Sequence, residues 1–315
     1  MNNYLISIII PVYQEQNKLH DNILTIYSIL THNKIKSEFI IVDDGSHDNT
    51  WLEINKLCTE LGNITAIRLS RNFGKEAALC AGLENAKGDA CIVMDSDLQH
   101  PPEIIPQMVS LWSNEGYDVV EGIKKSRGRE RLLNKLGAKT FYSLLKYFSG
   151  LDLNNASDFK LLDKSVIEAW RQMDERIVFF RGMSAWVGFK RTSILFEVAD
   201  RKDGHSRWSF YKLFKLAINA ITAFSSAPLQ IVTFMGVIFL IGALILGIQT
   251  LYMKLMHIAF SGFTTVILLL LIIGSSLMIS LGIIGTYIAR IFDEVKRRPR
   301  YLISERVDNN TLEDK

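Results

Sequence analysis

The sequence of 315 residues has only three cysteines, Cys58, Cys80 and Cys91, and none are in Cys-x-x-Cys spacing. We therefore expect packed thiols in a reducing compartment rather than metal ligands. The chain has no internal repeat. Its N-terminus lacks a basic region followed by an apolar core and a cleavage site, so we expect no signal peptide. The net charge is only +3, and we expect no nucleic-acid partner.

Charged residues are also missing from two long stretches, 231–251 and 263–289. Hydrophobic residues make up 48% of the chain, and their excess is concentrated after Pro228. A membrane-spanning helix needs about 20 apolar residues, which each stretch supplies. Two buried core helices are the alternative. We expect two transmembrane helices within residues 228–290.

The basic residues beside these stretches predict an orientation. The connection around 252–262 carries only Lys254 and His257. Basic residues stay on the cytoplasmic side, so we expect a multi-pass membrane protein with both termini in the cytoplasm. The basic residues that flank the two stretches are Lys212, Lys215, Arg290, Lys296, Arg297, Arg298 and Arg300.

Two segments before the apolar stretches have amphipathic patterns, 129–148 and 208–224. Basic helices with aromatic faces suit a bilayer interface, although an apolar face in the domain core is the alternative. We therefore expect a cytoplasmic catalytic domain at 1–205, an interfacial helix at 206–227 and a polar cytoplasmic tail at 291–315.

Four apolar runs before residue 100 alternate with helical patterns, which indicates βαβ units. We expect an α/β domain with a mostly parallel sheet and helices on both faces. Each run ends in polar residues, so several acidic groups should converge at one edge of the sheet. The runs are Ser7–Tyr13, Phe39–Val42, Thr65–Leu69 and Ala90–Met94.

The sequence Asp95-Ser96-Asp97 follows the fourth run. Carboxylate oxygens suit a hard divalent cation that is shared with substrate phosphates. Asp97 is the candidate for direct metal ligation by Mg²⁺ or Mn²⁺, and Asp95 is the second candidate for contact with the metal. The alternative is that both carboxylates only cap the following helix.

A set of ordered motifs resembles the family 2 glycosyltransferases of the GT-A fold. The specific likeness is to polyprenyl-phosphate glycosyltransferases, a group that includes bactoprenol glucosyltransferases and dolichol-phosphate mannose synthase. It covers nearly the whole chain. The motifs are Pro11-Val12-Tyr13-Gln14-Glu15, Val42-Asp43-Asp44-Gly45-Ser46, Arg71-Asn72-Phe73-Gly74-Lys75, Asp95–Pro102, Ser157–Asp163, Phe179-Phe180-Arg181-Gly182 and Gly204-His205-Ser206-Arg207-Trp208.

This resemblance implies inverting, metal-dependent sugar transfer from a nucleotide sugar to a membrane polyprenyl phosphate. UDP-glucose and undecaprenyl phosphate are the first expectations, and the product would be a lipid-linked sugar for cell-envelope glycans. N-acetylglucosamine, mannose and modified arabinose remain alternative sugars. A homo-oligomer is expected, with a tetramer as one candidate, because glycine and serine line the second apolar stretch.

The resemblance also implies roles for particular residues. Asp158 is the candidate base, or it positions the acceptor phosphate or a metal. Arginine matches phosphate oxygens in a fork, so four arginines are candidates for the acceptor phosphate: Arg127, Arg129, Arg131 and Arg201. The candidates for donor binding are Pro11, Tyr13, Glu15, Asp44, Lys75, Asp95, Ser96, Gln99, Ser206 and Arg207. For Lys75, a simple salt bridge is the alternative.

Two rival functions fit less well. Processive polysaccharide synthases use a Gln-x-x-Arg-Trp motif, whereas Arg207-Trp208 follows Gly204, and two spans are too few for an enclosed polymer channel. A non-catalytic membrane scaffold with a degenerate domain would not need the intact set of acidic residues. Metal-dependent hydrolysis of a nucleotide sugar would separate an enzyme from a scaffold.

The basic cluster at 290–300 leads to a prediction about membrane orientation. A cysteine introduced as Ser261→Cys should react with an impermeant thiol reagent added outside intact cells, because residue 261 lies in the sparsely charged connection. Ser304→Cys should react only after the cells are opened. Labelling in the reverse pattern would place the catalytic domain outside the cytoplasm.

Overall fold

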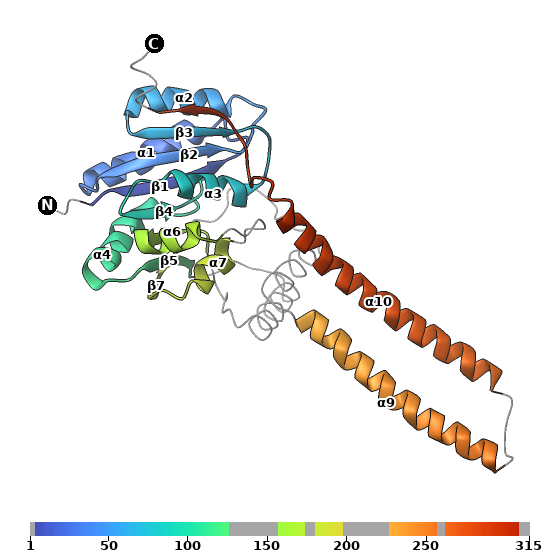
Figure 1. The fold of residues 1–315 in the computed structure, drawn as a ribbon. Helices are drawn as coiled ribbons and strands as arrows, with labels where there is room; N and C mark the ends of the chain where they lie inside the picture. The colour runs from blue at the N-terminus through green and yellow to red at the C-terminus, as the bar shows by residue number, and fades with distance from the viewer. Residues whose placement is uncertain (1–3, 126–156, 174–179, 198–226, 257–261, 309–315) are drawn as a thin grey trace. The chain divides into compact units, whose positions relative to one another are not determined.

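The structure is a computed structural model, and it describes residues 4–125, 157–173, 180–197, 227–256 and 262–308. The chain divides into two units (Figure 1). The first unit comprises residues 1–207 together with 298–315, and the second comprises 208–297. The amphipathic segments 129–148 and 208–224 both lie outside the described residues, so their interfacial role stays a prediction.

A sheet of eight strands forms the centre of the first unit, in the order β7-β5-β6-β4-β1-β2-β3-β8. Four adjacent strands, in the order β4-β1-β2-β3, are parallel and coincide with the four apolar runs of the sequence. They are β1 (Ile6–Val12), β2 (Ser37–Asp43), β3 (Ile64–Leu69) and β4 (Ala90–Val93). Six of the seven residues of β1 are buried, as expected for a strand covered on both faces. The predicted α/β architecture is therefore confirmed.

Helices cover both faces of these strands. Ile6, Ile8 and Ile10 of β1 belong to a core with residues of α1 and α2. Ile9, which lies between Ile8 and Ile10 and points to the other face of the sheet, contacts Gly82 of α3. Since the crossover from β3 to β4 runs back across β1, its helix α3 lies on the opposite face from α1 and α2 (Figure 1). These helices are α1 (Leu19–His32), α2 (Thr50–Leu61) and α3 (Lys75–Asn85).

The remaining strands extend the sheet on both sides. The strand β6 pairs antiparallel with β4 and β5, and β7 is parallel to β5. On the other side, β8 pairs antiparallel with β3 and comes from the segment that follows the apolar helices. The elements are η1 (Pro102–Ile104), α4 (Ile105–Glu115), β5 (Val119–Lys124), β6 (Lys160–Asp163), α6 (Lys164–Arg171), α7 (Phe180–Trp186), β7 (Arg191–Phe196) and β8 (Ile303–Val307). The strand β8 lies within residues 291–315, for which the sequence predicts only a polar tail, so that part of the prediction is wrong.

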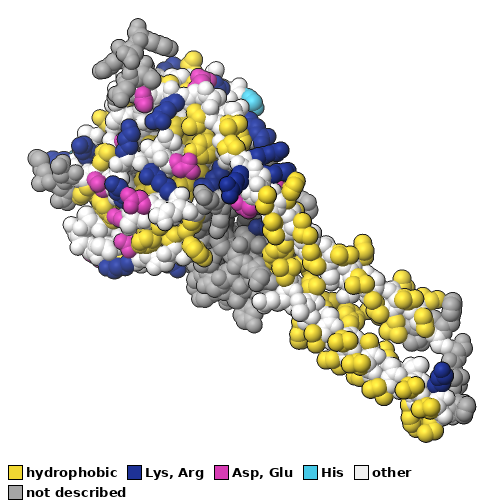
Figure 2. All heavy atoms as spheres, in the orientation of Figure 1, with side chains coloured by type: hydrophobic (Ala, Val, Ile, Leu, Met, Phe, Trp, Pro, Cys, Tyr) yellow, Lys and Arg dark blue, Asp and Glu magenta, His cyan; other side chains and the backbone are white. Residues whose placement is uncertain are grey.

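The second unit contains the two apolar helices, α9 (Ala227–Leu255) and α10 (Phe263–Val295). Within them, Pro228–Leu255 and Leu269–Val295 have mean hydropathies of 2.8 and 2.2 and are not buried in the structure. Figure 2 shows hydrophobic side chains along both helices. By length and composition each is able to cross a membrane, so the two helices are candidate spans.

Two glycines allow a prediction about stability. Gly45, after β2, and Gly116, after α4, have φ angles of 70° and 65°. A Cβ at Gly45 would lie 2.5 Å from the backbone carbon of Arg71, whereas a Cβ at Gly116 would meet nothing within 4 Å. Gly116→Ala should therefore cost about 1–2 kcal/mol from the left-handed backbone alone, and Gly45→Ala distinctly more. Denaturant unfolding of the purified chain measures both, and equal losses would contradict the close approach at Gly45.

Candidate active site

A cavity of about 350 Å³ opens where β1, β2 and β4 end. The strand order reverses between β4 and β1, and such a switch point is where open α/β sheets bind ligands. Its volume falls within the range of about 300–1,000 Å³ typical of small-molecule sites. The lining residues are Pro11, Val12, Tyr13, Glu15, Asp44, Asn72, Gly74, Lys75, Ala78, Asp95, Ser96 and Asp97.

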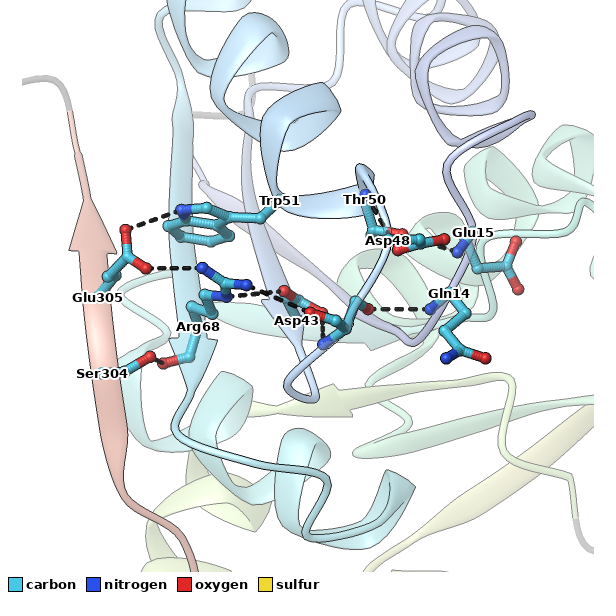
Figure 3. Close-up of polar contacts among 10 residues, drawn as sticks. Gln14, Glu15, Asp43, Asp48, Thr50, Trp51, Arg68, Ser304 and Glu305 are labelled. Carbon is cyan, nitrogen blue, oxygen red and sulfur yellow. Dashed lines mark hydrogen bonds and ion pairs between the residues drawn. The ribbon is translucent and has the colours of Figure 1, made fainter.

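The loop after β1 presents Tyr13 and Glu15 to this cavity. Between them Gln14 has a φ of 57°, an uncommon conformation for a residue with a Cβ. Its N–H donates to Ser46 Oγ at 2.9 Å, and the N–H of Glu15 donates to Thr50 Oγ1 at 2.9 Å (Figure 3). Burial, together with the nearby carboxylate of Asp97, raises the pKa of Glu15.

Asp44 is buried and joins the turn after β2 to the loop before α3. Its Oδ1 accepts from the N–H of Phe73 at 2.7 Å, and its Oδ2 accepts from the N–H of Gly74 at 2.9 Å. Burial raises the pKa of Asp44, while these two hydrogen bonds act in the opposite direction. Each oxygen retains a lone pair, so the carboxylate shapes the pocket and still has capacity to accept from a ligand.

The loop after β4 presents Asp95 and Asp97. The N–H of Asp95 donates to Nδ1 of the buried His100 at 3.2 Å. Burial lowers the pKa of His100, which favours the neutral imidazole that this acceptor role requires. Asp97 is exposed, and its Oδ1 accepts from the N–H of Gln99 at 3.0 Å. Asp97 therefore makes a local capping contact and also faces the cavity.

Lys75 connects the cavity to Asp158. Its Nζ lies 2.6 Å from Asp95 Oδ1 and 3.1 Å from Asp158 Oδ2. Asp158 is also held by Arg181, whose Nε and Nη2 donate to the two carboxylate oxygens at 2.6 and 2.9 Å. Although burial acts in the opposite direction, Arg181 and Lys75 hold the pKa of Asp158 far below its usual range. Asp158 therefore remains an anion at any pH at which the protein is assayed.

A family model described as "Glycosyl transferase family 2" matches residues 7–171, which include the loops after β1, β2 and β4 and also Asp158. The chain belongs to glycosyl transferase family 2. It is 37% identical to an uncharacterised glycosyltransferase of Synechocystis over 95% of both chains. It is also 34% identical to a prophage bactoprenol glucosyl transferase homolog of Escherichia coli, over 95% of this chain and 98% of that one. The bactoprenol glucosyl transferase of Shigella phage SfII is 34% identical over 95% and 97%.

Solved structures with a similar fold include S. aureus TarS in complex with UDP-GlcNAc. Its TM-score is 0.49 at 17% identity, over 69% of this chain and 65% of that chain. Another is glucosyl-3-phosphoglycerate synthase from Mycobacterium tuberculosis in complex with Mn²⁺, UDP-glucose and phosphoglyceric acid. Its TM-score is 0.47 at 20% identity, over 70% and 79% of the two chains.

Most candidate residues of this glycosyltransferase lie together in the structure. Seven of the ten donor-binding candidates line the cavity, and so does Asp97. Gln99 does not, although its N–H contacts Asp97. For Lys75 both interpretations hold, because it forms a salt bridge with Asp95 and also lines the cavity. Six candidates lie outside the described residues: Arg127, Arg129, Arg131, Arg201, Ser206 and Arg207.

Three residues of this region were not among the predicted site residues. Arg181 donates hydrogen bonds to Asp158. His100 accepts from the backbone N–H of Asp95 and stacks on Phe159, with ring centroids 4.9 Å apart. Glu76 accepts from the N–H of Phe180 at 2.9 Å and so fixes the start of α7. Arg181 and His100 lie within motifs that carry the family resemblance, and this was the available signal. No comparable pattern marks Glu76.

The oxygen atoms of this site fit a hard divalent cation. Asp95 and Asp97 offer carboxylate ligands on one turn, beside Glu15. Among the described residues, no group of three or more His, Cys, Asp or Glu side chains is arranged to hold a metal ion. Two carboxylates nevertheless match Mg²⁺, which binds through one or two carboxylates and completes its shell with water and substrate phosphates.

The ion pairs of Asp158 generate a prediction about pH. Asp158→Asn should lower turnover by about 100-fold or less, which is no more than the lower end of the range for loss of a catalytic base. Because its pKa is lowered, Asp158 stays ionised from pH 5.5 to 8.5, so the deficit should not change over this range. Comparison of the pH–rate profiles of the variant and the wild type measures this. A deficit that shrinks as a phosphate acceptor ionises, near a pKa of about 6, would instead assign Asp158 the role of base.

Proposed function

We propose that this glycosyltransferase transfers a sugar from a nucleotide sugar to a polyprenyl phosphate in the bacterial cell membrane. UDP-glucose is the first candidate donor and undecaprenyl phosphate the first candidate acceptor. The observation that carries the proposal is the extent of the likeness to relatives named bactoprenol glucosyl transferase. It covers at least 95% of both chains, so it includes the apolar helices as well as the catalytic domain.

The cavity has the chemistry that a nucleotide diphosphate requires. Tyr13 is 39% exposed and can stack on the base, and Glu15 and Asp44 can accept from its N–H groups. Lys75, Ser96 and Asp95 line the same cavity, and we propose that they contact the phosphates, ribose and sugar. Ser206 and Arg207 are proposed to close over the donor, by the family resemblance.

The charge of this cavity supports a divalent cation as cofactor. Glu15, Asp44, Asp95 and Asp97 line it, and among the described lining residues the positive charge comes from Lys75. A diphosphate would add further negative charge to this imbalance. When bound by Asp97 and Asp95, Mg²⁺ or Mn²⁺ would neutralise the charge that develops on the departing diphosphate.

For the transfer itself, an oxygen of the acceptor phosphate attacks the anomeric carbon while the bond to the nucleotide diphosphate breaks. Attack opposite the leaving group inverts the configuration. The phosphate has a second pKa of about 6 and is already an anion at neutral pH. Asp158 is occupied by Arg181 and Lys75. We therefore assign it a positioning role for these two cations, which can then face phosphate oxygens.

The lipid acceptor fits the proposed arrangement of the chain. A catalytic domain at 1–205 would lie in the cytoplasm, where nucleotide sugars are made, and an interfacial segment at 206–227 would lead to two spans within 228–290. Arg127, Arg129, Arg131 and Arg201 are proposed to contribute to binding the lipid phosphate. Residues 291–315 would return to the cytoplasm, and a homo-oligomer such as a tetramer would bury the small residues of α10.

The proposed cation leads to a mutational prediction. Asp97→Asn should lower sugar transfer by at least about 100-fold, as for loss of a group that faces developing charge. The purified full chain would be assayed with Mn²⁺ and a short polyprenyl phosphate, using UDP-glucose, UDP-N-acetylglucosamine and GDP-mannose in parallel. Asp21→Asn is the matched control, since this carboxylate is exposed on α1.

The outcomes of this assay are distinct. Transfer from one of the three donors, with loss of activity on chelation of the metal, is the expected result. Near wild-type turnover of Asp97→Asn would refute the metal assignment. Absence of transfer and of nucleotide-sugar hydrolysis in the wild-type protein would refute the proposed function and favour a scaffold.

A further inference from the structure

The strand β8 brings a carboxylate from the end of the chain to the edge of the catalytic sheet. It follows α10 and pairs antiparallel with β3, which places Glu305 opposite Arg68. These two residues are 237 positions apart in the sequence. The first unit thus contains a strand that the chain supplies only after both apolar helices have been made.

Glu305 uses both of its carboxylate oxygens. Oε1 accepts from Nη1 of Arg68 at 2.8 Å, and Oε2 accepts from the indole N–H of Trp51 at 2.9 Å (Figure 3). The guanidinium of Arg68 in turn lies over the ring of Trp51, 5.7 Å from its centroid. The side chains of Glu305 and Trp51 therefore fix the direction in which Arg68 points.

Arg68 points at the turn that follows β2. Its Nη2 donates to the carbonyl oxygen of Ser46 at 3.2 Å, and its Nε lies 3.5 Å from Oδ2 of Asp43. The side chain of Asp43 is 0% exposed, and its Oδ1 accepts from the N–H of Ser46 at 2.9 Å. Among the described residues, Oδ2 accepts no hydrogen bond. The buried carboxylate of Asp43 therefore depends on Arg68 for its compensation.

This turn supports the candidate donor pocket in two ways. Asp44, next to Asp43, lines the cavity directly. Ser46 accepts from the N–H of Gln14 at 2.9 Å, which sets the course of the segment between Tyr13 and Glu15. Figure 3 shows the contacts continuing from Glu305 through Arg68 and Asp43 to this segment.

We propose that Glu305 is a positioning residue for the nucleotide of the donor, acting through Arg68 and Asp43 on the turn that carries Asp44. The proposal rests on the proposed function, because it takes the cavity as the donor site. It goes beyond that function in giving β8 a role in donor affinity. A glycosyltransferase domain that lacks the segment after the apolar helices would then be impaired in nucleotide binding.

Glu305→Gln tests the proposal. Glutamine has an amide N–H₂ donor in place of one carboxylate oxygen, so either Arg68 or Trp51 then faces a donor where it had an acceptor. Arg306→Gln is the matched control on the same strand. Arg306 lies on the opposite face of β8, where its Nη1 donates to Asn85 Oδ1 at 3.1 Å. Arg68→Lys is a second variant, because a single ammonium group cannot serve Glu305, Ser46 and Asp43 together.

The measurements are the dissociation constant of UDP in the presence of Mn²⁺, the KM and kcat for UDP-glucose, and the thermal midpoint without nucleotide, all on the full chain. Glu305→Gln should weaken UDP binding and raise the donor KM by about 3–10-fold, the size expected for one partly exposed charged contact. The kcat and the acceptor KM should change less. Arg68→Lys should also weaken UDP binding and raise the donor KM. Arg306→Gln should bind UDP with the affinity of the wild type.

Two other results would overturn the proposal. If Glu305→Gln and Arg68→Lys lower the thermal midpoint but leave the UDP affinity and donor KM unchanged, β8 only stabilises the sheet. If Arg306→Gln weakens UDP binding equally, the effect belongs to the strand and not to Glu305. Failure of the wild-type protein to bind UDP or GDP, with or without Mn²⁺, would instead refute the proposed donor site itself.

Discussion

The pocket at the ends of β1, β2 and β4 gathers carboxylates, and their mutual repulsion is the constraint on which the surrounding structure depends. Each carboxylate is compensated differently. Asp44 is held by two backbone N–H groups, and Asp95 by Lys75. Asp97 is left exposed, and together with burial it raises the pKa of Glu15. The compensation is therefore incomplete on the side that faces the cavity, where a divalent cation would complete it.

The part of this arrangement that the sequence predicts is the part set by local pattern. The strands β1 to β4 contain apolar runs, because a parallel strand that helices cover on both faces buries most of its side chains. The positions of Tyr13, Asp44 and Asp97 follow from these runs, since each stands one to four residues after its strand. The convergence of their loops then follows from the parallel direction of the strands.

The contacts that could not be predicted join segments without a shared local pattern. Arg181 reaches Asp158 because Glu76 anchors the start of α7. Likewise, β8 alternates too weakly to be recognised, and four of its five residues are exposed. Its place in the sheet depends on pairing with β3 and on the bonds of Glu305. Such pairings are long-range in the sequence, and neither periodicity nor turn residues encode them.

The position of β8 also bears on how the chain meets a membrane. The strands β1 to β7 precede the two apolar helices and β8 follows them, yet all eight belong to one sheet. A sheet cannot be shared between the two sides of a bilayer, because its strands must hydrogen-bond to each other. The segment between β7 and β8 must therefore cross an even number of times, which the two candidate spans satisfy. The sheet thus requires both flanks of the helices to lie on the same side of any membrane that they cross. That this side is the cytoplasm stays a prediction from the basic residues after α10.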